Sequence, residues 1–272
     1  MQSIGYITTA AALLVFGSLE AIGGLYTNGK RSKDDYTMEF VCVFVLPVLI
    51  QPAIMVFAGL SLDHLLRNYK DSLAHINTWL MILSFVIFDD FTQYWWHRLA
   101  HVNSWFWKLH RPHHTAPQMG VLVSYRNAFL YYAIMPGIWF SSLLVWLGMG
   151  GVYVWYLAVK MVIVIGAHSD FRWDRFLYRY KLLHPLTWII ERIISTPATH
   201  FAHHGLNDED NISNANGNFG NLFFFWDVLF GTAKITRQYP AEFGTWNPVK
   251  DRWYVELFYP FLRSKNKDSE LH

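Results

Sequence analysis

Long apolar runs separated by short polar segments dominate the chain up to about residue 170. A helix that crosses a bilayer needs about 20 mostly apolar residues. Five segments approach that length: residues 4–26, 38–60, 76–96, 129–149 and 152–167. Glu20 weakens the first segment, and Pro47 and Pro52 should bend the second. The pattern predicts an all-α integral membrane bundle of four to five transmembrane helices.

The last two of these segments predict a helical hairpin. Gly148, Gly150 and Gly151 lie between them, and this glycine-rich turn carries no charge. A hairpin that enters the membrane and returns leaves Arg126 and His168 on the same side.

Basic residues in the connecting loops predict the orientation. Three lie between the first two segments (Lys30, Arg31 and Lys33), against two between the second and third (Arg67 and Lys70). Cytoplasmic loops carry an excess of basic residues, so we expect the first loop, and with it the far end of the third segment, on the cytoplasmic side. From Asp170 onward the chain is more polar, which predicts a cytoplasmic helical cap.

Composition supports a membrane protein and excludes some functions. The chain is 53% hydrophobic, 18% aromatic and only 15% charged, which departs from soluble averages. A formal net charge of +2 offers no basic field for nucleic acid. The single cysteine, Cys42, permits no internal disulfide and supports no thiolate metal site. We interpret residues 1–272 as a single membrane domain with N-terminal helices (1–75), a histidine-rich core (about 76–232) and a C-terminal tail (233–272).

Eight histidines form three tight clusters beside apolar segments. The clusters are His97 and His101; His110, His113 and His114; and His200, His203 and His204. Residues three and four apart on a helix share a face, and neutral imidazole is the commonest side-chain metal ligand. Polar tips of membrane-interface helices would explain one cluster but explain three poorly. Eight imidazoles exceed one tetrahedral zinc site, so the pattern predicts a dinuclear metal site.

Single polar residues near the clusters allow two interpretations. Asp90 falls on the helix face of His97 and could accept its second ring N–H, or it could cap or hydrate a helix end. His168 stands alone in sequence, but the predicted hairpin returns it to the clusters. Four other histidines have no such placement, and we leave them out of the ligand set: His64, His75, His184 and His272.

These motifs resemble the fatty acid hydroxylase and sterol desaturase superfamily of membrane di-iron oxygenases. Residues 90–101, 109–114 and 196–204 resemble its three histidine boxes in order. The N-F-G at 218–220 and the W-D-V-L-F-G-T at 226–232 are similar to stretches that follow the last box in many members. The chain looks most like bacterial sterol-desaturase-like members and the alkylglycerol monooxygenase branch.

The resemblance implies a metal pair, a co-substrate and partners. It implies two iron ions, O2, a lipid or sterol-like substrate, and the eight clustered histidines as catalytic ligands. His168 would join them as a further ligand, with Asp90, Asn218 and Asp227 supporting the ligands. The sequence has no heme-binding H-P-G-G segment, so we expect an external electron donor of the cytochrome b5, ferredoxin or NAD(P)H-reductase type. The expected location is a bacterial inner membrane.

Substrate and reaction outcome stay open at this point. The long polar loop between His204 and Asn218 departs from the family and leaves the substrate contacts undetermined. Whether the substrate is hydroxylated or desaturated depends on how it is placed at the site. A zinc-dependent membrane hydrolase is an alternative, although no His-Glu-x-x-His arrangement is present and Glu191 and Glu209 are the only obvious bases. A non-catalytic metal-binding membrane protein is a third possibility.

Overall fold

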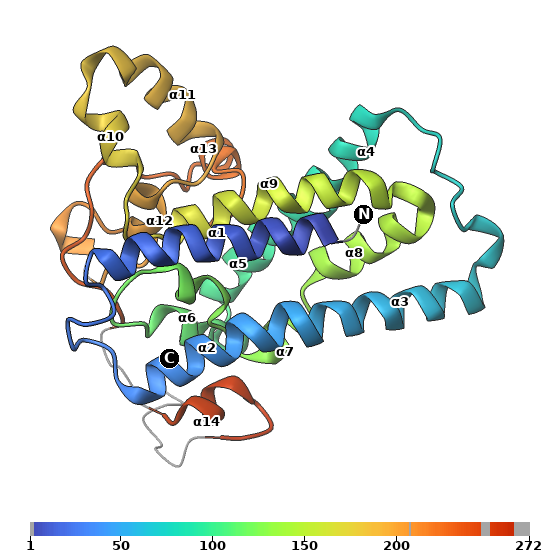
Figure 1. Ribbon diagram of the computed structural model, residues 1–272, viewed down its shortest axis with the longest axis horizontal. Helices are drawn as coiled ribbons and strands as arrows, with labels where there is room; N and C mark the ends of the chain where they lie inside the picture. Colours follow the sequence, from blue (N-terminus) through green and yellow to red (C-terminus); the bar gives the residue numbers. More distant parts are fainter. Residues whose placement is uncertain (1–2, 207, 246–250, 264–272) are drawn as a thin grey trace.

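The computed structural model describes residues 3–206, 208–245 and 251–263. These residues form helices and no strand, with isolated bridges only at Ile194–Phe223 and Gly205–Phe243. The long helices run side by side along the molecule, and several short helices of the C-terminal half gather at one end (Figure 1). The predicted all-helical architecture is confirmed.

The first predicted segment is helix α1 (Ser3–Ile22), which packs along α9 (Gly150–His168). Glu20, expected to weaken this segment, is buried at its end. Its carboxylate accepts hydrogen bonds from the backbone N–H groups of Val121 and Asp170, at 3.1 and 2.9 Å. Glu20 therefore joins three separate segments of the chain.

The second predicted segment is part of one apolar rod, Lys33–Leu65. It consists of α2 (Lys33–Val45), the π-helical turn η1 (Leu46–Ile50) and α3 (Gln51–Leu65). Proline removes a backbone donor and crowds the preceding turn, and η1 holds Pro47, with Pro52 following at the start of α3. The wider turn accommodates these prolines without ending the helix.

The third predicted segment extends further than expected. Helix α4 (Thr78–Phe85), the π-helical turn η3 (Val86–Phe91) and α5 (Thr92–Val102) follow without a break, so His97 and His101 lie on the final turns. Asn103 then caps α6 (Ser104–His114) by accepting from two backbone N–H groups.

The fourth predicted segment, residues 129–149, is broken rather than continuous. Helix α7 (Phe129–Ala133) stops before Met135, which is extended because Pro136 follows it. Helix α8 (Pro136–Leu144) and the turn η5 (Val145–Met149) lead to Gly148, whose φ of 106° reverses the chain into α9. The predicted glycine hairpin is confirmed.

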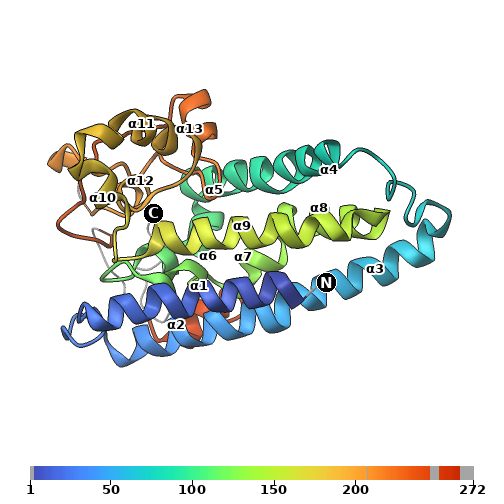
Figure 2. The same cartoon turned by 45° about the horizontal axis from the view of Figure 1, so that its top comes forward.

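In the part of the chain that the structure describes, three helical stretches are long and apolar enough to cross a membrane: Ile4–Ile22, Lys33–Leu65 and Phe129–His168, the last of which contains the break at Met135 and the reversal at Gly148. They expose large apolar side chains such as Leu14, Val48 and Leu60, each about two thirds exposed. The α4–α5 rod, although it runs beside them (Figure 2), is not among the candidates. It carries Asp89 and Asp90 at its middle and histidines at its end.

Short helices make up the end of the molecule that holds the histidine clusters, as Figures 1 and 2 show. They include α10 (Asp174–Arg179), α11 (His184–Ile193), α12 (Pro197–His203) and α13 (Phe225–Phe230). Helix α14 (Trp253–Leu257) packs against α2. The short turns are η2 (Arg67–Tyr69), η4 (Val121–Tyr125), η6 (Lys181–Leu183) and η7 (Asp208–Asp210).

The loop between α1 and α2 lies at this same end, and the loop between α3 and α4 lies at the opposite end. The relative sides predicted from the basic residues therefore agree with the structure. Arg31 is a difference, because it is buried in an ion pair with Glu39 at 3.0 Å. Only Lys30 and Lys33 of the predicted trio are exposed.

Candidate metal centre

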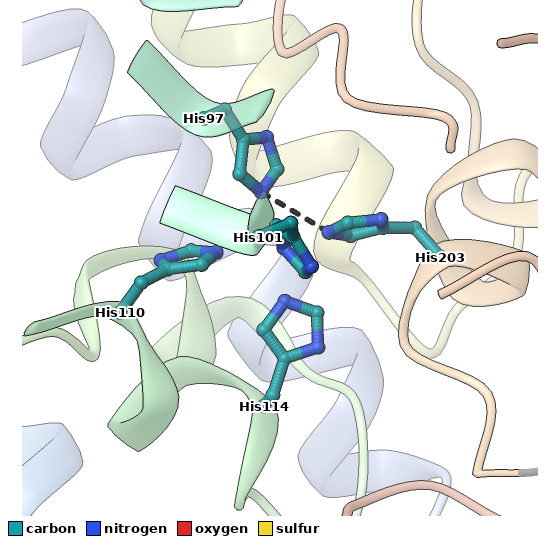
Figure 3. A group of neighbouring side chains, drawn as sticks. All are labelled: His97, His101, His110, His114 and His203. Carbon is teal, nitrogen blue, oxygen red and sulfur yellow. Dashed lines mark hydrogen bonds between the residues drawn. The ribbon is translucent and has the colours of Figure 1, made fainter. Parts of the chain in front are cut away.

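Nine buried or largely buried histidines meet in two groups, each with ligand nitrogens within 4.8 Å of one another. The five-histidine group comprises His97, His101, His110, His114 and His203 (Figure 3), and the four-histidine group comprises His113, His168, His200 and His204. The structure thus brings together all three sequence clusters and His168. His184 lies elsewhere and donates from Nε2 to the Tyr178 carbonyl at 3.1 Å. His64 and His75 belong to neither group, and His272 lies outside the described residues.

Helical spacing places the rings in each group. His97 and His101 are one turn apart on α5, and α6 carries the second cluster, with His113 and His114 on its last turn and His110 just before it. Helix α12 carries His200 and His203, and Thr196 caps its start in a reciprocal pair with Thr199. Asp174 adds an acceptor for the Ala198 N–H at 2.7 Å, which fixes the start of α12.

Oxygen acceptors fix the orientation of five of the rings. A carbonyl oxygen can only accept, so each Nδ1 facing one carries the proton and the same ring's Nε2 keeps a lone pair. The Nδ1 pairs are His97–Phe219 (2.7 Å), His203–Gly217 (2.7 Å), His113–Val123 (3.0 Å), His168–Val164 (2.7 Å) and His110 with Asn127 Oδ1 (2.7 Å).

The lone pairs that result converge on one another. Nε2 of His97 lies 3.0 Å from Nε2 of His203, the dashed contact in Figure 3, and Nε2 of His113 lies 3.4 Å from that of His168. Because the proton of each ring is on Nδ1, neither pair has a hydrogen to share. Four more Nε2 atoms are buried without a hydrogen-bond partner in the described part of the chain: those of His101, His110, His114 and His204.

Buried acceptors without donors are rare and costly, and a cation in each group would satisfy them. Burial lowers the pKa of His200, His203 and His204 well below the ordinary value, and repulsion between neighbouring imidazoles lowers it further. The rings are therefore neutral, which is the form that binds metals. This donor set fits transition-metal ions that accept imidazole.

A short loop, residues 217–220, supplies two of the carbonyls. Asn218 has a φ of 56°, and its side chain donates to Thr199 O at 2.8 Å. Asp227 accepts from the N–H groups of Phe219 and Gly220, at 2.8 and 2.6 Å. Asn218 and Asp227 therefore hold the loop that orients His97 and His203.

Asp90 occupies a different place from the one its spacing indicates. It accepts from Trp226 Nε1 at 2.8 Å and from Phe223 N at 3.3 Å, while the Phe219 carbonyl takes the ring N–H of His97. Sequence reasoning missed Asn127, the acceptor for His110. It lies 17 residues from that histidine, so no helical spacing indicates the contact.

The fold and the centre together define a helical membrane protein with a buried, histidine-only site for metal ions. Residues 82–232 match the fatty acid hydroxylase family, and the chain belongs to it. The predicted resemblance to the fatty acid hydroxylase and sterol desaturase superfamily is confirmed. No solved structure matches the chain.

Alkylglycerol monooxygenases are among the proteins similar to this chain. That of Xenopus tropicalis is 28% identical over 181 residues, which cover 63% of this chain and 33% of that protein. That of Danio rerio is 26% identical over 197 residues (68% and 37%), and that of Homo sapiens 25% over 170 residues (61% and 34%). The chain spans about a third of the length of these relatives.

Proposed function

We propose that this protein is an O2-dependent di-iron oxidoreductase that hydroxylates or desaturates a lipid or sterol-like substrate. The observation that carries the proposal is the convergence of nine neutral imidazoles in two groups, with Nε2 lone pairs that face one another. The family and the alkylglycerol monooxygenases support lipid oxidation as the reaction.

The reaction balances with two electrons from outside the described centre. In hydroxylation a C–H bond and O2 give an alcohol and one water, with two electrons and two protons consumed. In desaturation two C–H bonds on adjacent carbons are broken, and with O2, two electrons and two protons they give a double bond and two waters. We propose a cytochrome b5-, ferredoxin- or NAD(P)H-reductase-type protein as the external donor. When bound, two irons supply the activation of O2 toward an unactivated C–H bond.

The protein itself positions the substrate beside the proposed metal site and keeps water out of the cavity that holds it. His97, His110, His113 and His168 line one wall of a cavity that continues between the apolar helices. Apolar side chains from those helices, including Leu46, Ile138 and Leu157, line it further on. A substrate chain held there has a carbon beside the histidines, which replaces a bimolecular encounter with a fixed geometry.

The test combines metal content with product formation. Detergent-purified protein expressed with iron should contain about two irons per chain, one for each histidine group, by elemental analysis and Mössbauer spectroscopy. His101→Ala and His200→Ala each remove one ring from a different group and should lower iron content. His184→Ala is the matched control, since its ring belongs to neither histidine group and donates to the Tyr178 carbonyl.

Product formation separates the oxygenase from its alternatives. With 1-O-hexadecylglycerol, reductant and 18O2, the purified protein should give an 18O-labelled or desaturated product, and removing either O2 or reductant should abolish it. A hydrolase would need neither, and a metal-binding protein without activity would form no product. A single zinc per chain, or iron content indifferent to both centre variants, would contradict the proposal.

A further inference from the structure

The cavity beside the histidines has a charged pair on its wall, and one member of the pair lies within a candidate membrane span. Lys160 on α9 and Asp89 on η3 both line it, and their side chains are 9% and 8% exposed. Lys160 Nζ donates to Asp89 Oδ2 at 2.6 Å. Charged groups are rare within a span such as Phe129–His168, and where they occur they usually serve function.

The backbone around Asp89 is adapted to this pair. Asp89 lies on the π-helical turn η3, a feature frequent at functional sites. Helix α8 passes close over it at Gly137, where a Cβ atom would lie 2.5 Å from Asp89 Oδ1 and 3.2 Å from its carbonyl oxygen. An apolar pair would join the same helices at no lower stability, so helix packing alone does not account for the charges.

Two further polar atoms on the cavity wall are buried and lack a hydrogen-bond partner among the described residues. They are Gln93 Oε1 and Ser124 Oγ. Gln93 lies one helical turn after Asp89 and one turn before His97, so it bridges the ion pair and the centre. Ser124 follows Val123, whose carbonyl orients His113. Buried polar atoms rarely lack a hydrogen-bond partner, so these two atoms indicate a ligand that provides the missing partners.

We propose that Lys160, Asp89, Gln93 and Ser124 bind an uncharged, hydroxyl-bearing group of the lipid substrate inside this cavity. The wall offers both donors and acceptors, because the Lys160 ammonium has three N–H donors and the amide, hydroxyl and carboxylate oxygens accept. A hydroxyl group uses both. Lys160 and Asp89 neutralise each other, so a phosphate or carboxylate would enter without a compensating charge.

This inference rests on the proposed function for the identity of the ligand as substrate, but its test requires no turnover. Binding of radiolabelled 1-O-hexadecylglycerol and of hexadecane is measured with the full iron-loaded chain in nanodiscs, under argon and without reductant. The unaltered protein should bind the hydroxylated lipid at least about tenfold more tightly, equivalent to one or two hydrogen bonds.

Variants test whether the polar residues of the cavity wall cause this preference for the hydroxylated lipid. Gln93→Met and the charge-neutral double variant Lys160→Met with Asp89→Asn should each weaken binding of the hydroxylated lipid about tenfold and leave hexadecane binding unchanged. Ser124→Ala should weaken it less. The matched control is Ser142→Ala, because the Ser142 hydroxyl bonds Ile138 O of its own helix. Iron content and melting temperature verify that each variant is folded.

Equal affinity of the unaltered protein for both probes would overturn the inference, as would unchanged preference in a folded Gln93→Met variant. If the double variant loses iron, the binding measurements with Gln93→Met and Ser124→Ala still test whether the cavity wall binds the hydroxyl-bearing group. Absence of oxidised product under O2 would instead count against the proposed function and would leave the binding result standing.

Discussion

Each oriented imidazole in the centre donates to a neutral oxygen: four rings use backbone carbonyls and His110 uses the Asn127 amide. A neutral acceptor fixes the tautomer without adding charge. Both histidine groups contain only imidazole, with no carboxylate. The proposed metal ions would therefore keep their full positive charge inside the protein, which favours electron uptake from a donor.

Asn127→Leu should weaken metal binding while the protein stays folded. The substitution removes the acceptor for the His110 ring N–H, and loss of such a partner typically costs 10- to 100-fold in metal affinity. Chelator competition measures the change. Tyr132→Phe is the control, because it removes the other side-chain partner of Asn127 and leaves His110 untouched. Equal affinity in the Asn127 variant would contradict the orienting role.

Gly220→Ala should destabilise the loop that holds His97 and His203. A Cβ atom there would lie 2.6 Å from Phe223 O and 2.8 Å from Asp227 Oδ2, and backbone cannot move aside cheaply. We expect a loss of roughly 1–3 kcal/mol together with reduced iron content. Thermal melting and elemental analysis measure both. Gly59→Ala, inside helix α3 where nothing lies within 4 Å, should lower neither, because alanine favours a helix more than glycine does. A Gly220 variant that matches it would refute the prediction.

At this scale the sequence predicts the ligands better than their partners. The histidines of one box share a helix, so spacing alone indicates that they converge. The acceptor for His97 is Phe219 O, 122 residues away, and it depends on how the loop 217–220 folds. Asp90 illustrates the limit, because its spacing from His97 suggested a contact with that ring, whereas its partners are Trp226 and Phe223.

At the scale of elements, the length and hydropathy of the segments predicted the long helices. Individual proline and glycine residues determined where those helices are interrupted. In the second rod Pro47 lies in a π-helical turn and Pro52 follows at the start of α3, and the helix stays continuous, whereas Pro136 splits the fourth predicted segment. A proline at a helix start and one in a widened turn look alike in sequence. The glycine hairpin was predictable because Gly148 adopts a φ that other residues rarely reach.

Helix α14 joins the bundle through a buried network of charges. Arg126 lies 2.9 Å from Asp35, 3.4 Å from Glu39 and 3.8 Å from Glu256 on α14. Its Nε also donates to the Pro112 carbonyl at 2.7 Å, within the second histidine box. The network therefore couples the C-terminal part of the described chain to α6.

Stability should fall as pH rises from about 4.5 to about 7, because of Glu256. Burial raises the pKa of Glu256 to about 7 from an ordinary value of 4.5, and nearby Arg126 offsets only part of that increase. Between these values the folded state binds a proton that the unfolded state has lost, so the free energy of unfolding decreases with increasing pH. Melting temperatures in detergent from pH 5 to 8 measure the slope.

Glu256→Gln should flatten that dependence and melt a few degrees above the unaltered protein at pH 8. The amide keeps the shape of the side chain without its ionisation. Glu242→Gln changes an exposed carboxyl instead and should keep the original slope. An unchanged slope in the Glu256 variant would show that other groups cause it.

For the whole molecule, the two ends differ in the elements that they contain. The histidine centre, the loop between α1 and α2, and the short helices share one end, and the loop between α3 and α4 lies at the other. The cavity continues from the centre between the apolar helices. In the proposed reaction, the lipid would enter through this cavity and the proposed electron donor would approach the histidine end.

The predicted orientation, with the histidine end cytoplasmic, is testable with single cysteines. Cys42 is buried, so the unaltered protein should resist labelling. Asn28→Cys places a thiol in the exposed loop at the histidine end, and Ser72→Cys places one in the exposed loop at the opposite end. In intact bacterial spheroplasts a membrane-impermeant maleimide should label only the Ser72 variant, and lysis should expose the Asn28 variant.

The reverse pattern would place the centre outside, where cytoplasmic reductases cannot supply its electrons. Labelling of both variants before lysis would mean that the chain does not separate the two loops across a bilayer.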